Sequence, residues 1–250
     1  MTANRVFKYK FFHREPYTEL YLKSDIAELV LEPHDEDFID LSGMVIGGKI
    51  SDVEIIREQE KNILRVSISS KKEAAVFNIK AKIRIPINKI PTKIFVTSDS
   101  GDIRLDGLPI KSIYLHTNNG DITLLGVDGK KVEAENINGD IYIRGGTYRE
   151  MKASSTNGDI LVDLEAINGR LVFETINGEI RFVTTNDSNV IIEASTINGV
   201  INIQNEQLLT VKTSENRFFQ GMLGDGDGEA LLKSVNGQIK IEVLESVKEE

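Results

Sequence analysis

The sequence has 250 residues, of which 40% are hydrophobic, 28% charged and only 6% aromatic, and 39 acidic residues against 30 basic ones give a net charge of −9. This charge argues against a nucleic-acid binder, because phosphate contacts need a basic face. The absence of cysteine excludes a disulfide framework and a thiolate zinc site.

No membrane span or targeting segment is evident in the sequence. No apolar run approaches the roughly 18 residues that a membrane-spanning helix needs, and the first ten residues carry charge where a signal peptide would be apolar. We therefore expect a cytoplasmic location, with the cell surface, reached by an unrecognised route, as the alternative.

Residues 1–90 are expected to be rich in β-strand without any repeat. Segments with alternating apolar and polar residues, such as 63–68 and 76–85, predict strands, and Pro86 and Pro91 separate them from the rest of the chain. This region forms either its own sheet or irregular first coils that cap the repeats, because an open end of a repeat array presents unpaired backbone groups.

Residues 91–244 contain the dominant feature of the chain, a recurring Asn-Gly-acid-Ile motif. Successive glycines are 19, 19, 19, 20 and 21 residues apart, and the last copy follows after 38 residues, which is twice 19. The glycines of the motif are Gly101, Gly120, Gly139, Gly158, Gly178, Gly199 and Gly237. A nearly constant period in this range indicates a repeat architecture.

Aligned on their glycines, the copies predict two short strands joined by a tight corner. Apolar residues recur two and four positions after the glycine and five and seven positions before it, which is strand alternation with one face buried. A column of small polar residues three positions before the glycine predicts an internal hydrogen-bonded ladder: Ser98, Thr117, Asn136, Ser155, Thr175, Thr196 and Ser234. The Asn-Gly pair supplies two residues that tolerate positive φ. Alanine at Gly139 is therefore expected to be destabilising, and more so than at Gly226, which lies in a glycine-rich loop.

Two assemblies of these units are compatible with the pattern. In a β-solenoid each unit of about 19 residues is one coil, and equivalent positions stack at about 4.8 Å. In an antiparallel meander closed into a sandwich or barrel, each Asn-Gly is a hairpin turn. The constant period and the like residues at aligned positions favour an all-β solenoid.

The sequence resembles the DUF4097 family of bacterial β-strand repeat proteins, whose members carry the description "putative adhesin". The resemblance lies in Ile83–Pro86, in the segment from Thr97 to Ile103, in the Asn-Gly-Asp-Ile copies and in Gly224–Gly228, and it covers about residues 20 to 243. It implies a β-solenoid-like fold and an adhesive role.

The acidic residues that come directly after the glycines are the candidate functional residues. They are Asp102, Asp121, Asp140, Asp159 and Glu179. Stacked carboxylates raise one another's pKa or recruit a cation, so this acid column is a candidate calcium or sugar ridge or a catalytic site like that of a polysaccharide lyase. The interpretation that we favour is structural, with each carboxylate accepting N–H bonds of the turns. A basic residue beside paired carboxylates in a groove would favour the enzyme.

No other cofactor, metal or nucleophile motif stands out. The three histidines, His13, His34 and His116, lack ligand spacing, and Asp225–Glu229 predicts a flexible turn rather than a calcium loop. We therefore predict a non-enzymatic scaffold or interaction module without cofactor. Its partner is an unknown protein or glycan, and it is a monomer or weak homo-oligomer.

The last apolar segment, Ile239–Leu244, is expected to form the open C-terminal edge of the solenoid. The charged tail 245–250 directly after it is a candidate guard against end-to-end association, because unpaired strand edges template aggregation.

Overall fold

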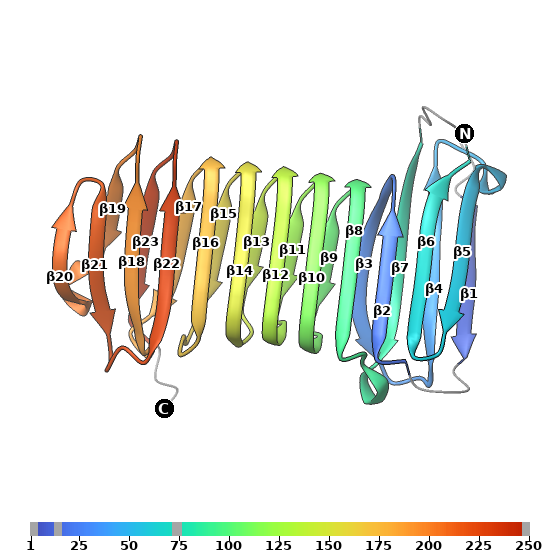
Figure 1. Cartoon of the computed structure of the whole chain (residues 1–250), viewed down its shortest axis with the longest axis horizontal. Coiled ribbons are helices and arrows are strands. Elements are labelled where there is room, and N and C mark those ends of the chain that lie inside the picture. Colours follow the sequence, from blue (N-terminus) through green and yellow to red (C-terminus); the bar gives the residue numbers. More distant parts are fainter. Residues whose placement is uncertain (1–4, 13–16, 72–76, 247–250) are drawn as a thin grey trace.

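The computed structural model describes residues 5–12, 17–71 and 77–246, which form two long β-sheets packed face to face (Figure 1). In spatial order, sheet A consists of β1 (Arg5–Phe12), β4 (Phe38–Ile46), β7 (Asn78–Pro86), β3 (Ala27–His34), β9 (Ile103–Asp106), β11 (Ile122–Leu125), β13 (Ile141–Arg144), β15 (Ile160–Leu164), β17 (Ile180–Thr185), β23 (Ile239–Leu244) and β19 (Ile201–Gln204).

Sheet B runs over the same stack on the opposite side. In spatial order it consists of β20 (Thr210–Glu215), β21 (Phe218–Leu223), β18 (Val190–Thr196), β22 (Gly228–Ser234), β16 (Arg170–Asn177), β14 (Tyr148–Asn157), β12 (Asp128–Asn138), β10 (Pro109–Asn119), β8 (Lys93–Ser100), β2 (Glu19–Ser24), β6 (Ile63–Ser70) and β5 (Val53–Glu60). Short 3-10 helices lie at Ile50–Asp52, Ile87–Lys89 and Glu206–Leu208. Within the described residues, no helix has the length and apolarity needed to cross a membrane.

Each repeat is one coil of a β-solenoid, as the period predicts. A longer strand in sheet B passes through the Asn-Gly corner into a shorter strand in sheet A, and the next coil lies parallel to it. The register pairs equivalent residues, for example Ile122 with Ile141 in sheet A and Leu115 with Ala134 in sheet B. The hairpin alternative is wrong for the repeats, because their neighbouring strands pair in parallel.

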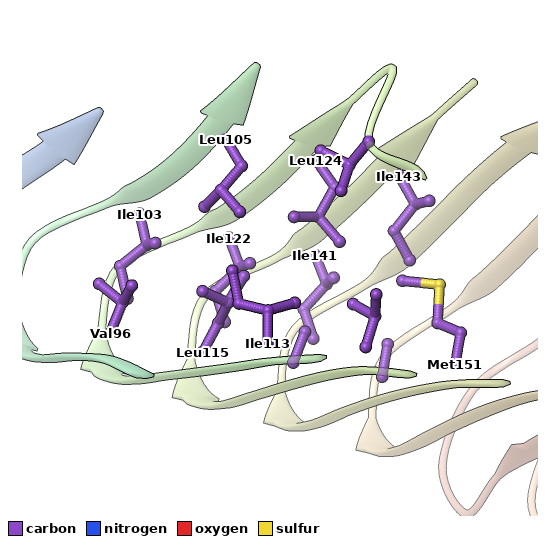
Figure 2. Close-up of a cluster of buried hydrophobic side chains, with 14 of the residues drawn as sticks. Val96, Ile103, Leu105, Ile113, Leu115, Ile122, Leu124, Ile141, Ile143 and Met151 are labelled. Atoms are coloured by element: carbon purple, nitrogen blue, oxygen red, sulfur yellow. The ribbon is translucent and has the colours of Figure 1, made fainter. Parts of the chain in front are cut away.

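The core consists of the predicted apolar columns. Ile103, Ile122 and Ile141 from sheet A are fully buried. Figure 2 shows them stacked coil upon coil, with Leu115 of sheet B among them. Because strand alternation sends every second side chain inward, the positions between them point to solvent and are free to vary.

The spatial order of the coils departs from the sequence order at both ends of the stack. The last coil, β22–β23, lies between the coil β16–β17 and the coil β18–β19, and pairs in parallel with both. The chain reaches this position through β20 and β21. Strand β21 pairs antiparallel with the outer side of β18, and β20 pairs antiparallel with β21. At the other end, β2–β3 lies between β6–β7 and β8–β9.

This order corrects the expectation for the C-terminus. Strand β23 is bonded on both sides and is therefore an interior strand, whereas β19 and β20 form the edges at that end of the molecule (Figure 1). A tail attached to β23 does not guard an open edge by its position. Residues 247–250 of that tail lie outside the described residues.

The corners also differ from the expected turn geometry. Gly101, Gly120 and Gly139 have φ of 149°, 155° and 149°, but the residues before them, Ser100, Asn119 and Asn138, are not in a left-handed conformation. Among the described residues the only non-glycine residues with positive φ are Lys61 and Asn205. Gly158, Gly178, Gly199 and Gly237 are not among the glycines with positive φ, so a corner needs at most one residue with positive φ, not two.

The expected contrast with Gly226 is also wrong in its premise. Gly226 has a φ of +74°, and an added Cβ there would lie 2.8 Å from the Met222 sulfur and 2.9 Å from Ile191 Cγ1. The turn is held in place by Asn189, whose amide donates to Asp227 at 2.8 Å. Gly226 is therefore no unconstrained reference position.

Candidate functional site

The structure brings all five residues of the acid column together on one edge of the stack, beside the Asn-Gly corners. Each aspartate accepts the backbone N–H of the acidic residue in the next coil. The distances are 2.9 Å from Asp121 N to Asp102 Oδ1, 2.8 Å from Asp140 N to Asp121, 2.8 Å from Asp159 N to Asp140 and 2.7 Å from Glu179 N to Asp159. One oxygen of each aspartate is thus engaged in holding coil to coil.

The electrostatics of the acid column follow from this stacking. Burial raises the pKa of Asp121, and the charges of Asp102 and Asp140 add to the effect, while the N–H bond from Asp140 opposes it. The Tyr142 hydroxyl donates to the second oxygen of Asp140 at 2.8 Å, and this bond is the main reason why the pKa of Tyr142 is raised to about 12. No group of three or more His, Cys, Asp or Glu side chains within the described residues is arranged to hold a metal ion.

The asparagines of the corners form a second column, an amide ladder along the outside of the stack. Asn138 donates to Asn119 at 3.0 Å, Asn157 to Asn138 at 2.9 Å, Asn177 to Asn157 at 2.8 Å, Asn236 to Asn177 at 2.8 Å and Asn198 to Asn236 at 2.9 Å. The ladder runs from Asn177 through Asn236 to Asn198, so it tracks the inserted last coil rather than the sequence.

The small polar column lies inside the corner, and its side chains donate to the backbone. Thr175 Oγ1 bonds the carbonyl oxygen of Gly158 at 2.9 Å, Ser234 Oγ that of Gly178 at 3.0 Å and Thr196 Oγ1 that of Gly237 at 2.9 Å. These buried hydroxyls satisfy carbonyl groups at the corners. The predicted column is thus internal, but its bonds run to the backbone, and the hydroxyl of Ser98 has no hydrogen-bond partner. The amide ladder, most of the small polar column and one oxygen of each aspartate in the acid column are thus used to stack the coils.

The outer face of sheet A carries charged side chains that are not hydrogen-bonded to a corner of the backbone. A groove of about 680 Å³ crosses the outer face near β15, β17, β23 and β19, and its lining includes Asp159, Glu179, Arg181, Lys240 and Glu242. Lys240 Nζ lies 2.8 Å from Glu179 Oε1, and Arg181 lies 3.2 Å from Glu242 Oε2. Gln238 also donates to Glu179, at 2.6 Å.

This groove meets the condition that would favour an enzyme, a basic residue beside paired carboxylates. Sequence reasoning missed it because Lys240 and Glu179 belong to coils that are distant in the chain. They meet only because β23 lies beside β17. The spacing of 38 residues between the last two glycines signals an additional coil, but it does not say between which coils it lies.

The outer face of sheet B has a different character. A hollow of about 460 Å³ is lined by three aliphatic side chains, Ile176, Ile197 and Val235, by serine and threonine residues and by the ion pair of Glu174 and Lys233. Further along, Tyr21 and Phe95 stack on each other with ring centroids 4.5 Å apart and an interplanar angle of 7°. Each ring covers one face of the other, and the guanidinium of Arg65 lies over the Tyr21 ring, 5.2 Å from its centroid.

A sequence model of the Toastrack DUF4097 family matches residues 67–242. A protein from Bacteroides fragilis NCTC 9343, described as a "putative adhesin", has a similar structure, with a TM-score of 0.52, 14% identity, and coverage of 96% of this chain and 98% of that one. A "putative lipid binding protein" from Parabacteroides distasonis ATCC 8503 gives a TM-score of 0.48 at 14% identity, covering 97% of both chains. A "putative cell adhesion protein" from Clostridium sporogenes ATCC 15579 gives 0.43 at 11% identity, covering 97% of this chain and 100% of that one.

No curated protein matches the chain by sequence. At these identities the similarity to the solved structures concerns the fold alone.

Proposed function

We propose that this chain, which belongs to the Toastrack DUF4097 family, is a non-enzymatic β-solenoid scaffold whose outward faces bind another molecule in an adhesin-like role. The partner is a protein or a glycan, and the chain acts as a monomer or weak homo-oligomer. No cofactor takes part.

One observation carries this proposal. The polar positions that repeat from coil to coil are used to stack the coils, whereas the outward positions of the strands change. Three positions after the glycine, for example, the side chains are Arg104, Thr123, Tyr142, Leu161, Arg181, Asn202 and Lys240. A constant frame with a variable surface suits recognition, because each coil adds side chains to one continuous face without disturbing the core.

The experiment uses the full chain, displayed on fluorescent beads, against an oligosaccharide array and against cultured cells. Two variant pairs assign any binding to a face. Arg181→Glu with Lys240→Glu changes the outer face of sheet A, and Ile176→Lys with Ile197→Lys changes that of sheet B. We expect one pair to abolish binding and the other to preserve it. Equal binding by both pairs and the native chain would contradict recognition through an outward face.

A second candidate, a carbohydrate-active enzyme of the polysaccharide lyase type, is favoured by one contact. Lys240 beside Glu179, with Asp159 in the same groove, offers a base near carboxylates. The binding role has better support, because Lys240 is already engaged in an ion pair with Glu179 at 2.8 Å and would have to leave that partner before it could act on a substrate. Incubation with polygalacturonate or alginate decides between them. An ultraviolet-absorbing unsaturated product that disappears in Lys240→Met would establish the enzyme.

A further inference from the structure

We propose that the groove on the outer face of sheet A binds a linear, uncharged glycan that lies along the solenoid axis. This inference rests on the proposed binding function and names both the face and the ligand class. The shape, the charge and the spacing of the groove support it.

The hollow surface is long rather than round. The groove near β15 to β19 adjoins a second groove of about 480 Å³ that reaches back to β11 and β13. The two grooves share the lining residues Leu161, Arg181 and Glu242. Together they extend over the outer face of sheet A across neighbouring coils. A surface of this form fits an extended chain molecule better than a compact ligand.

The charges in the main groove nearly cancel. Asp159, Glu179 and Glu242 face Arg181 and Lys240, which gives three negative charges against two positive ones. Asp159 and Glu179, the two residues of the acid column in this groove, repel an anionic ligand, and the two cations are already paired with carboxylates at 2.8 and 3.2 Å. An uncharged ligand avoids both costs, because it neither meets the acid column as an anion nor breaks an ion pair.

The hydrogen-bonding groups of the groove match hydroxyl groups. Carboxylates accept, guanidinium and ammonium groups donate, and the amides of Asn202 and Gln204 do both. A sugar hydroxyl is a donor and an acceptor at once, so it can bridge a neighbouring Glu and Arg without displacing either. Side-chain accessibilities of 52% for Arg181 and 43% for Lys240 leave their remaining N–H groups within reach of such a ligand.

The second groove supplies apolar surface for the C–H face of a sugar ring. Its lining includes Leu125, Leu161 and Val183 together with the ring of Tyr142. The Tyr142 hydroxyl is already bonded to Asp140, which orients that ring. The lining also contains the ion pair of Arg144 and Asp163 at 3.5 Å, so this groove offers both aliphatic and polar contacts to a pyranose.

The spacing of the coils adds a periodic element. Equivalent side chains recur about every 4.8 Å along the stack, a distance close to the length of one sugar unit in an extended chain. A linear glycan that runs along the axis therefore presents about one sugar to each coil. Affinity should rise with chain length until the groove is filled.

Isothermal titration calorimetry with the full chain tests this. The probes are cello-, xylo- and chito-oligosaccharides of two to six units and an oligogalacturonate of six units. We expect at least one neutral series to bind, with affinity rising to about five units and then levelling off, and with weaker binding of the acidic probe.

The variants have matched controls on the opposite face of the same coils. Arg181 pairs with Glu242 at 3.2 Å and Lys240 with Glu179 at 2.8 Å on sheet A, while Arg170 pairs with Glu229 at 2.9 Å and Lys233 with Glu174 at 3.6 Å on sheet B. We expect Arg181→Ala with Lys240→Ala to weaken binding at least tenfold, and Arg170→Ala with Lys233→Ala to change it less than twofold. Thermal melts verify that both variants are folded.

Three results would overturn the inference: no neutral series binds, the acidic probe binds more tightly, or the sheet B variant weakens binding as much as the sheet A variant. If a protein or glycan binds through sheet B, the proposed binding function stands and only this assignment fails. If the native chain binds neither to the array nor to cells, the proposed function fails as well.

Discussion

Replacement of Gly158 by alanine tests why each corner of the stack carries glycine. Gly158 is not among the glycines with positive φ, so alanine there meets no left-handed backbone strain. An added Cβ, however, would lie 2.5 Å from the carbonyl carbon of Gly139 in the neighbouring coil and closer still to its oxygen. Since non-bonded carbon atoms approach to about 3.5 Å, the two corners have to move apart by about 1 Å.

The expected loss of unfolding free energy follows from the hydrogen bonds between the coil of Gly139 and the coil of Gly158. Gly139 N–H donates to Asn157 O at 3.1 Å, Asp159 N–H to the Asp140 carboxylate at 2.8 Å, and the Asn157 amide to Asn138 at 2.9 Å. Each such bond contributes about 1 kcal/mol net, so an opening that breaks all three costs about 3 kcal/mol. For a chain of this size, that is a loss of about 6–12 °C in Tm.

Gly126 provides the matched control. It has a φ of +57°, and an added Cβ has no heavy atom within 4 Å, so Gly126→Ala costs only the left-handed strain of about 1–2 kcal/mol. Gly126→Asn should cost less, because asparagine tolerates this conformation. Urea and thermal unfolding rank the three variants. If Gly158→Ala is no more destabilising than Gly126→Ala, close stacking is not what requires glycine at the corners.

Three further predictions concern the columns and the inserted coil. Asp121→Asn keeps an acceptor for Asp140 N–H but removes a carboxylate whose pKa is raised in the folded state. Such a carboxyl group favours the fold in its protonated form and costs stability when it is charged, so the variant should have a higher Tm than the native chain at pH 7. This difference in Tm should vanish below about pH 3.9, the ordinary pKa of aspartate. Millimolar calcium should leave Tm unchanged, since one oxygen of each aspartate in the acid column is already bonded, and a rise of several degrees that is lost in Asp121→Asn/Asp140→Asn would instead establish a cation ridge. A chain that ends at Leu223 should fail to fold cooperatively in urea, because the missing coil lies between two others; loss of a terminal coil only, with a slightly lower midpoint, would contradict the inserted position of β22–β23.

The amino-acid sequence by itself determined the local plan of each coil. The alternation around each glycine predicted which side chains point inward, because the side-chain period of a strand is two residues and one face must be buried. The constant period predicted parallel stacking over a hairpin meander, since stacked coils place like residues side by side. A carboxylate beside a turn was also expected to meet backbone N–H groups, but only the stacking shows that these N–H groups belong to the acidic residue of the next coil.

The tertiary structure alone decided the order of the coils at the ends. A coil with the right pattern can stack on any other, because the ladders of amide, carboxylate and hydroxyl groups are alike from joint to joint. The repeat pattern of the sequence therefore does not predict that Asn236 lies between Asn177 and Asn198. That order is set by the antiparallel strands β20 and β21, which close sheet B and turn the chain back.

The groove on sheet A depends on that order. Only the insertion of β23 beside β17 places Lys240 and Glu242 against Glu179 and Arg181. Contacts between segments distant in the chain arise from packing of the whole stack. The periodicity of a repeat specifies the structure of each coil but not which coils become neighbours.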